Sequence, residues 1–414
     1  MKKIFFSISV LSVFILLHHT LFAATYVVDK QKHFSIKQAL QLCKNGDTIL
    51  VEKGIYKEQN IVIDKSIVLK GLQRPVLDGE NKYEIISVKA DNVIVDGFHL
   101  QHSGRSGVDD IAGLKIYNAR NVVISNNSFE DTFWGIYTLY GINCTIINNS
   151  LKASGSSEAE NGNGIHCWKC DSMHIINNRI TGHRDGIYFE FVTNSTILKN
   201  KSVGNIRYGL HFMFSHNDEY TQNLFEKNGA GVAVMFSHGV KMHDNVFRAN
   251  WGDAAYGILL KEITDSKISH NNFVQNTVGV YMEGTSRMQV EKNIFNENGY
   301  AIKVMASCSD NDISYNNFLG NTFDIGTNGS LVLNSFDHNY WDKYEGYDLN
   351  RDKTGDVPYR PVSLYSMIAE RNPTVMMLFR SFMVTLFDKT EKVLPGIVPE
   401  NLKDNSPSMK PFRL

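Results

Sequence analysis

Apolar and polar residues alternate in short segments over most of the chain. GLHFMF (209–214) and GVAVMF (231–236) alternate with a period of two, which predicts a β-strand in each. GVKMHDN (239–245) predicts a second, shorter strand, and NVFRAN (245–250) predicts a third. Three short strands separated by polar turns are typical of one coil of a parallel β-helix.

The same three-strand unit repeats along the chain, most often after 22 residues. One series of residues opens each unit: Gly135, Gly164, Gly186, Gly209, Gly231, Gly257, Gly279 and Ala301. A second series of residues ends each unit: Asn127, Asn149, Asn178, Asn200, Asn223, Asn245, Asn272, Asn293 and Asn317. The longer gaps contain insertions at 155–163 and 252–255. Because stacked coils place equivalent residues side by side, the asparagines are expected to form a hydrogen-bonded ladder at one turn.

These patterns predict an all-β chain, a right-handed parallel β-helix with a C-terminal helical tail. Residues 1–24 have the charged start, apolar run and small residues of a secretory signal peptide. Residues 25–345 form the β-helix, with a capping helix predicted at 35–43. Residues 346–414 form a post-helix segment and an apolar tail, of which 374–387 is predicted to be helical.

Charge and cysteine content narrow the range of functions. The net charge of −1 gives no basic surface for nucleic acid. Five cysteines make an odd number without the spacing of a disulfide framework. HCWKC (166–170) is a modest signal for soft-metal or redox chemistry, but Cys167 falls at an inward position, so a packed thiol is the preferred interpretation.

Stacking by 22 residues brings methionines and histidines together on the outside of the coils. Met213 should lie beside Met235, and His216 beside His238. His211 lies two residues before Met213 on the same predicted face, and Met242 follows on the next strand. Thioether and imidazole ligands together suit a soft metal, above all Cu(I). The alternative is that these methionines are packing residues under the tail or the inserted loops.

Two other patterns suggest chemistry other than copper binding. Asp348–Asp356 is spaced like a calcium loop but lacks its glycine and bidentate glutamate, so a hydrogen-bonded turn is preferred. A set of polar residues on one face could instead serve a polysaccharide lyase or epimerase: Tyr188, Glu190, His211, Lys261, Glu283 and Lys303. Two lysines spread over three coils are few for a groove that binds an acidic polymer.

Several longer strings resemble one family. RYGLHFMFSHND (207–218), KNGAGVAVMFSH (227–238), NTVGVYMEG (276–284) and GDVPYRPVSLYS (355–366) are similar to the NosD family of nitrous oxide reductase maturation proteins. The resemblance covers essentially the mature chain. It implies a copper-binding periplasmic protein, not itself an enzyme, that works with an ABC transporter in assembling the copper–sulfide site of nitrous oxide reductase during denitrification.

The resemblance also implies partners and a location. The chain is expected at the periplasmic side of the inner membrane, with residues 374–394 docked on the membrane subunit of the transporter. Nitrous oxide reductase is an expected partner, and a copper chaperone is a further candidate. The resemblance carries over no ligand set, so one hypothetical set for Cu(I) rests on spacing alone: His211, Met213, His216, Met235, His238 and Met242. A lyase or epimerase, and a structural partner of the transporter that binds no metal, remain as alternatives.

Overall fold

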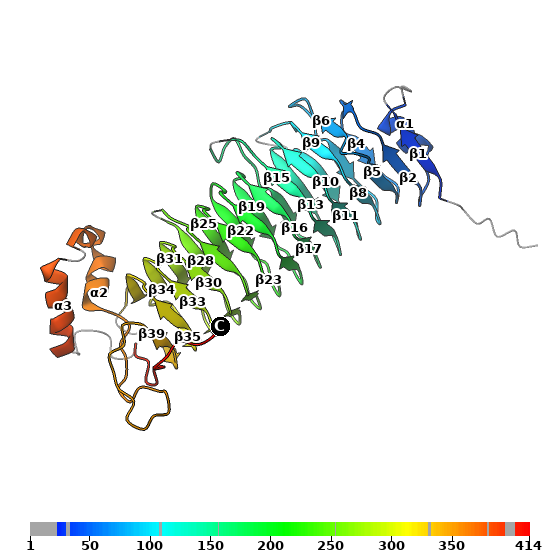
Figure 1. Ribbon diagram of the computed structural model, residues 1–414. Helices are drawn as coiled ribbons and strands as arrows, with labels where there is room; N and C mark the ends of the chain where they lie inside the picture. Colours follow the sequence, from blue (N-terminus) through cyan, green and yellow to red (C-terminus); the bar gives the residue numbers. More distant parts are fainter. Residues whose placement is uncertain are drawn as a thin grey trace, which may run out of the picture.

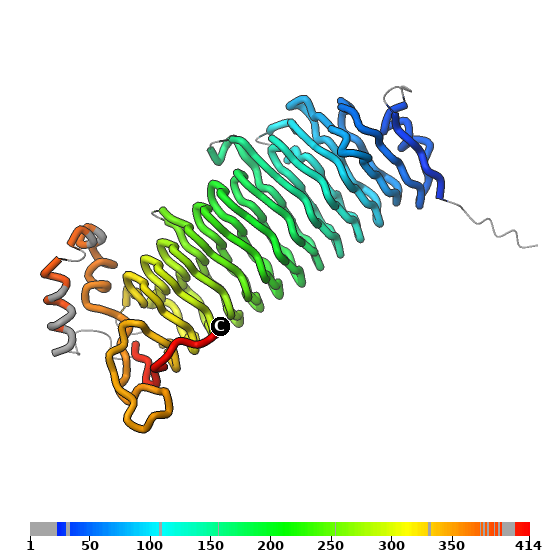
Figure 2. Tube along the Cα trace, viewed as in Figure 1, coloured from blue at the N-terminus to red at the C-terminus, as the bar shows by residue number. Residues whose placement is uncertain are grey.

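The chain winds into a long right-handed parallel β-helix, and the helices among the described residues lie at its two ends (Figure 1). The computed structural model describes residues 23–29, 34–106, 110–155, 157–252, 254–329, 333–378, 381–393 and 402–414. Successive coils stack along one axis (Figure 2). The predicted fold class and the predicted three strands per coil are confirmed.

Three parallel sheets, A, B and C, run along the solenoid, and strands about one coil apart in sequence are neighbours in each. Sheet A contains β1 (Thr25–Val28), β2 (Thr48–Val51), β5 (Val68–Gly71), β8 (Ile94–Asp96), β11 (Val123–Ser125), β14 (Thr145–Ile147), β17 (His174–Ile176), β20 (Thr196–Leu198), β23 (Glu219–Thr221), β26 (Lys241–His243), β29 (Lys267–Ser269), β32 (Gln289–Glu291), β35 (Ser309–Ser314) and β38 (Leu333–Asp337). Sheet B contains β3 (Ile55–Tyr56), β6 (Val76–Asp78), β9 (His99–Gln101), β12 (Ser128–Glu130), β15 (Ser150–Lys152), β18 (Arg179–Thr181), β21 (Lys201–Val203), β24 (Leu224–Glu226), β27 (Val246–Arg248), β30 (Asn272–Val274), β33 (Ile294–Asn296), β36 (Asn317–Leu319) and β39 (Tyr340–Trp341). Sheet C contains β4 (Ile61–Ile63), β7 (Ile86–Val88), β10 (Ala112–Tyr117), β13 (Trp134–Leu139), β16 (Ile165–Trp168), β19 (Asp185–Glu190), β22 (Tyr208–Met213), β25 (Ala230–Met235), β28 (Tyr256–Lys261), β31 (Val278–Glu283), β34 (Tyr300–Val304) and β37 (Phe323–Gly326).

The core consists of columns of identical or similar side chains. Most three-residue strands of sheets A and B bury their middle residue and leave the first and third partly exposed. Phe247 stacks on Phe273, and Phe273 on Phe295, with ring centroids 4.8 Å apart in both pairs. The column ends with Phe318 on Trp341 at 4.1 Å. Because every coil buries its apolar residues against its neighbours, the stability of each coil depends on the adjacent coils.

The predicted asparagine ladder is present, with two rungs displaced by one residue. In each rung, the backbone N–H and side-chain amide of one asparagine donate to the carbonyl oxygen of the next, as Asn245 does to Asn271 at 2.9 and 3.0 Å. The sequence series named Asn272 and Asn317 for these coils, but the ladder runs through Asn271 and Asn316. Asn272 and Asn317 begin the next strands, β30 and β36.

Each end of the solenoid is capped. At the N-terminal end, α1 (Ile36–Leu42) lies where a capping helix was predicted and starts with a capping box between Ser35 and Gln38. At the other end, the segment 402–414 returns to the last coil, and Asp404 replaces the next asparagine of the ladder. One carboxylate oxygen of Asp404 accepts hydrogen bonds from the Asn339 backbone at 2.9 Å and from the Trp341 indole at 3.0 Å.

The C-terminal helices project beyond the last coil (Figure 1). They are α2 (Leu364–Arg371), the 3₁₀ helix η2 (Pro373–Leu378) and α3 (Phe382–Val393). Glu370 of α2 forms an ion pair with Lys303 of β34 at 2.6 Å. The predicted signal peptide lies almost wholly outside the described residues. Within the described part of the chain, no helix has the length and apolar character needed to cross a membrane.

Candidate functional site

Met213 and Met235 are side by side on the outer face of sheet C. They end β22 and β25 and are paired in register, and both are half-buried. The side chains of Met213 and Met235 point outward, because successive residues of a strand face opposite sides and Phe212 and Val234 point into the core. The Tyr188 hydroxyl lies 3.9 Å from the Met213 sulfur. The structure therefore brings these two thioethers together as the repeat predicts.

His216 and His238 form a second pair. Their imidazole rings stack with centroids 4.0 Å apart and an interplanar angle of 21°. The backbone N–H of His238 donates to Nδ1 of His216 at 3.2 Å, so Nε2 is the nitrogen of His216 left to bind a ligand. Burial and the neighbouring His238 lower the pKa of His216. At neutral pH His216 is therefore in the uncharged form that binds metals.

A stack of phenylalanines runs between the two pairs. Phe214 follows Met213, and Phe236 follows Met235, while each histidine comes two residues later. The rings of Phe191, Phe214 and Phe236 stack at 5.2 and 5.0 Å and are exposed by 43%, 36% and 38%. All three have positive φ, between 51° and 54°, which is unusual for a bulky residue and turns the chain at this corner. The methionine pair and the histidine pair consequently lie on opposite sides of the phenylalanine stack.

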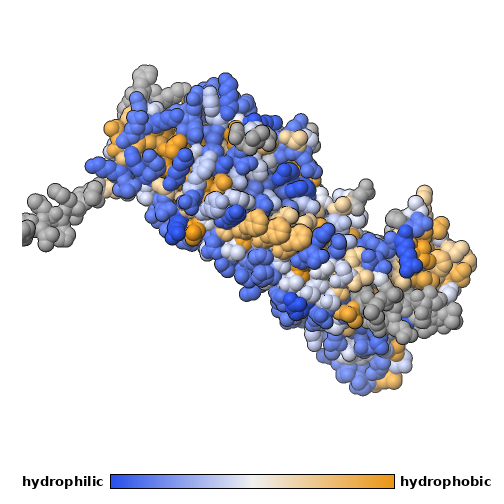
Figure 3. Space-filling model, turned by 180° about the vertical axis from the view of Figure 1, so that it is seen from behind, coloured by the Kyte–Doolittle hydropathy of each residue, from blue (hydrophilic) through white to orange (hydrophobic). Residues whose placement is uncertain are grey.

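This stack is conspicuous on a mostly polar surface. Figure 3 shows an apolar patch part-way along the solenoid, with hydrophilic residues around it. Between residues 186 and 250, the exposed large apolar side chains are those of the three phenylalanines. A metal held near the methionines would therefore have an apolar border on one side.

His211 is on the same face but is covered. It is only 6% exposed, and its ring lies between Tyr188 at 4.7 Å and Tyr208 at 4.8 Å. Nδ1 of His211 lies 3.5 Å from the carboxylate of Asp185. Asp185 is fully buried and accepts two hydrogen bonds from Arg207, at 2.9 and 2.6 Å. Burial would raise the pKa of Asp185, but these partners outweigh burial and lower it. His211 therefore belongs to a buried polar cluster behind Met213.

Met242 does not share this surface, which corrects its place in the predicted ligand set. It is the middle residue of β26 and is fully buried between Tyr220 and Ile268 of the neighbouring strands. A surface metal cannot reach its sulfur because the strand backbone separates them. His243 faces outward instead. Burial would lower the pKa of His243, but hydrogen bonds to Asp244 and Glu219 outweigh it and raise that pKa.

Other motifs have structural roles. Asp348 accepts the backbone N–H groups of Asp352 at 3.2 Å and Lys353 at 2.9 Å, as the preferred turn interpretation predicts. Cys167 is fully buried, as expected, and the other four cysteines are buried as well. Over the described ranges, three or more His, Cys, Asp or Glu side chains nowhere gather in a way that could hold a metal ion. A copper site at the two pairs would therefore need the methionine sulfurs.

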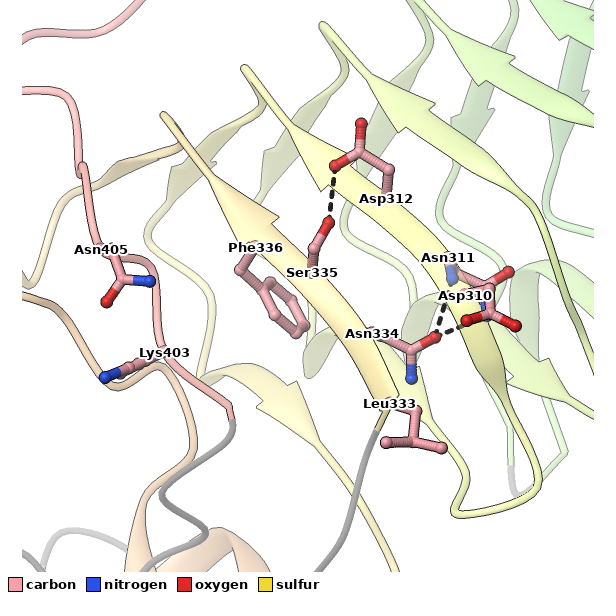
Figure 4. A pocket seen from close by; sticks show the side chains of 9 residues that line it. All are labelled: Asp310, Asn311, Asp312, Leu333, Asn334, Ser335, Phe336, Lys403 and Asn405. Atoms are coloured by element: carbon pink, nitrogen blue, oxygen red, sulfur yellow. Dashed lines mark hydrogen bonds between the residues drawn. The ribbon is translucent and has the colours of Figure 1, made fainter.

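The residues of the lyase alternative are largely engaged with one another or with the tail. Lys303 pairs with Glu370, and Lys261 lies 3.9 Å from Glu283. A separate groove of about 600 Å³ lies at the C-terminal end, between the last coils and Lys403 (Figure 4). Its lining includes two carboxylates, one of which accepts a hydrogen bond from Ser335 at 2.9 Å, but no methionine or histidine. This groove is remote from the candidate site.

Comparison with known proteins shows which proteins this chain resembles. The family described as "Periplasmic copper-binding protein (NosD)" matches residues 152–350. A "Probable ABC transporter binding protein NosD" from Pseudomonas aeruginosa is 26% identical over 400 residues, covering 85% of this chain and 86% of the relative. The chain is therefore similar to NosD proteins over most of its length. A relative of the same name from Stutzerimonas stutzeri is 26% identical over 378 residues, covering 86% of this chain and 85% of that one.

Solved structures support the fold of this chain. An exopolygalacturonase of family 28 from Yersinia enterocolitica superposes with a TM-score of 0.60 at 12% identity, covering 76% of this chain and 78% of that one. The A-module of mannuronan C-5 epimerase AlgE6 from Azotobacter vinelandii superposes with a TM-score of 0.50 at 15% identity, covering 75% of this chain and 94% of that one. Both are enzymes, but at this identity the likeness concerns the β-helix alone.

Proposed function

We propose that this chain is a periplasmic copper-handling assembly factor. In this proposal it works with an ABC transporter in the maturation of the copper–sulfide site of nitrous oxide reductase and is not itself an enzyme. The single observation that carries the copper role is the register pairing of Met213 with Met235, next to the stacked imidazoles of His216 and His238. Soft thioethers and imidazole are ligands that suit Cu(I).

The geometry favours a site built mainly by the two methionines, with a histidine completing it. The thioethers are adjacent, whereas the phenylalanine stack lies between them and the imidazoles. A histidine would therefore join the metal after a local movement at the corner. Open coordination of this kind suits a protein that passes copper on rather than storing it.

The C-terminal helices are the proposed contact with the transporter. Met377 and Phe382 are 90% and 81% exposed, which is unusual for large apolar side chains on a protein that has no partner there. α3 has 12 residues, fewer than the ~20 needed to span a bilayer. Residues 374–394 are therefore proposed to dock on the membrane subunit rather than cross the membrane. The proposal covers positions in this range that the structure does not describe.

The assembly role can be tested by replacing the native gene. A host lacking its own copy would receive the wild-type chain or the variant Met213→Leu, Met235→Leu, His216→Ala, His238→Ala. We expect the variant to yield nitrous oxide reductase with less copper and little activity. Met305→Leu, at a buried methionine of the core, and His174→Ala, on the outer face of β17, are controls.

Two outcomes would contradict parts of the proposal. Full maturation by the four-residue variant would leave the chain as a structural partner of the transporter that does not carry copper. Replacing Met377 and Phe382 by serine should abolish copurification with the transporter, while Leu349→Ser, at another exposed apolar residue, should not. Equal copurification of both variants would contradict docking through the tail.

A further inference from the structure

Cys167 and Cys170 face each other inside one corner of the solenoid. Cys167 points inward from β16, the chain turns at Lys169 with a φ of 51°, and Cys170 points inward again. Both side chains are buried. The Cys170 thiol donates to the carbonyl oxygens of Trp168 at 3.3 Å and of Thr138 at 3.4 Å, so it lies inside this corner.

The preceding coil shows how closely these two positions approach. Thr138 and Gly141 occupy them there, and a Cβ built on Gly141 would lie 2.4 Å from Cγ2 of Thr138. Side chains at these positions therefore meet directly. In the two following coils the same positions are Phe189 with Val192 and Phe212 with Ser215, so the cysteine pair is particular to this coil. A disulfide needs Cβ atoms about 3.5–4.5 Å apart, a separation that this corner can supply.

We propose that Cys167 and Cys170 are joined by a disulfide in the protein as it exists outside the cytoplasm. The inference rests on the family's periplasmic location and is independent of copper binding. Two S–H bonds break and one S–S bond forms. The two protons and two electrons pass to a protein disulfide that acts as the oxidant and is reduced to its dithiol. The periplasm keeps such oxidants available, whereas the cytoplasm does not.

Burial determines when the bond forms. Desolvation and the neighbouring Cys170 raise the pKa of the Cys167 thiol, so the reactive thiolate is scarce in the folded coil. Oxidation is therefore expected while the chain folds after export. Once formed, the bond is protected by the same burial.

Cys144 is the rival partner. Its sulfur lies 3.5 Å from the Cβ position of Gly141, and the backbone N–H of Gly141 donates to the Cys170 sulfur at 3.4 Å. A bond between Cys144 and Cys170 would link two coils. The turn at Lys169 places Cys167 and Cys170 in the same corner of one coil, which favours the pair within that coil. The two linkages are distinguishable chemically.

The test is thiol mapping of the full chain exported to a bacterial periplasm. The protein is quenched in acid and denatured. One sample is alkylated with iodoacetamide without reduction and a second sample is alkylated after reduction, and the intact mass of each is measured by mass spectrometry. We expect three of the five cysteines to be alkylated without reductant and all five after reduction. Trypsin cleaves after Lys169, so the disulfide should hold the two resulting peptides together until reductant is added.

Two control samples test whether the loss of alkylation depends on export and on Cys170. The same chain retained in the cytoplasm should have five alkylated cysteines, and exported Cys170→Ser should have four. Five alkylated cysteines in the exported wild-type protein would overturn the proposal. Peptides that link Cys144 to Cys170 would also overturn it. The measurement on the wild-type chain needs no variant to fold.

Discussion

Asp218 makes stability depend on pH in a direction opposite to that of most carboxylates. It is 1% exposed and points into the solenoid, where one oxygen accepts the Ser195 backbone N–H at 2.8 Å. The other oxygen has no hydrogen-bond partner. Burial, opposed by the Ser195 hydrogen bond and reinforced by Asp171, raises the pKa of Asp218 from 3.8 to about 8. The folded protein therefore keeps this carboxyl protonated at pH 7.

The direction in which stability changes with pH follows from the pKa values of Asp218 in the folded and the unfolded chain. Between pH 4 and pH 8 the unfolded chain loses the proton of Asp218 and the folded chain retains it, so stability falls as the pH rises. At pH 7 ionisation of the unfolded carboxyl favours unfolding by about 4 kcal/mol. In Asp218→Asn this penalty disappears, because the amide is neutral in both states. Its oxygen can still accept from Ser195, and its N–H replaces the carboxyl proton as a donor.

We therefore expect Asp218→Asn to be more stable than the wild type by about 4 kcal/mol at pH 7 and nearly equal to it at pH 4. Urea unfolding followed by circular dichroism at pH 4, 7 and 8.5 measures this difference. Asp64→Asn, at an exposed carboxylate, controls for the loss of one negative charge. A variant no more stable than the wild type at pH 8.5, or a difference independent of pH, would refute the reasoning.

Two other substitutions test how the C-terminal end is held. Asp404→Ala removes the acceptor shared by Asn339 and Trp341, so we expect the free energy of unfolding to fall by about 2–4 kcal/mol and hydrogen exchange in β38 and β39 to become faster. Asp404→Asn should be intermediate, because an asparagine continues the ladder. Unchanged exchange in Asp404→Ala would contradict the capping role. Breaking the Lys303–Glu370 pair by Lys303→Glu should cost about 1 kcal/mol and expose α2 to limited proteolysis. The charge-swapped double variant should restore protection, and failure to do so would show that the ion pair does not hold α2.

The repeat predicted most of the fold because its period and its strand alternation are both visible in the sequence. The repeat could not show which asparagine joins the ladder at 271–272 and at 316–317, since either residue of each adjacent pair could be the inward one. The ladder residue is the one that follows the positive-φ residues His270 and Tyr315, and this depends on backbone geometry. The ladder could be predicted, but not its register.

The candidate site was predicted in part. The pairing of Met213 with Met235 follows directly from the 22-residue spacing. Met242 was misplaced, although the pattern Lys241, Met242, His243 gives a signal, because an apolar residue between two polar ones in a three-residue strand points inward. The contact of His211 with Asp185 of the preceding coil has no local signal, and neither has the cap that Asp404 provides from 65 residues beyond Asn339.

Binding of Cu(I) by the purified chain 25–414 is the most direct measurement of the central claim. The protein would compete with a chromogenic Cu(I) chelator under anaerobic conditions, beside Met213→Leu/Met235→Leu, His216→Ala/His238→Ala and the control Met305→Leu. The account predicts tight binding by the wild type and the control, a large loss in the methionine variant and a smaller loss in the histidine variant. Equal binding by all four proteins would place the copper elsewhere, and no binding by any of them would contradict a copper site on this chain.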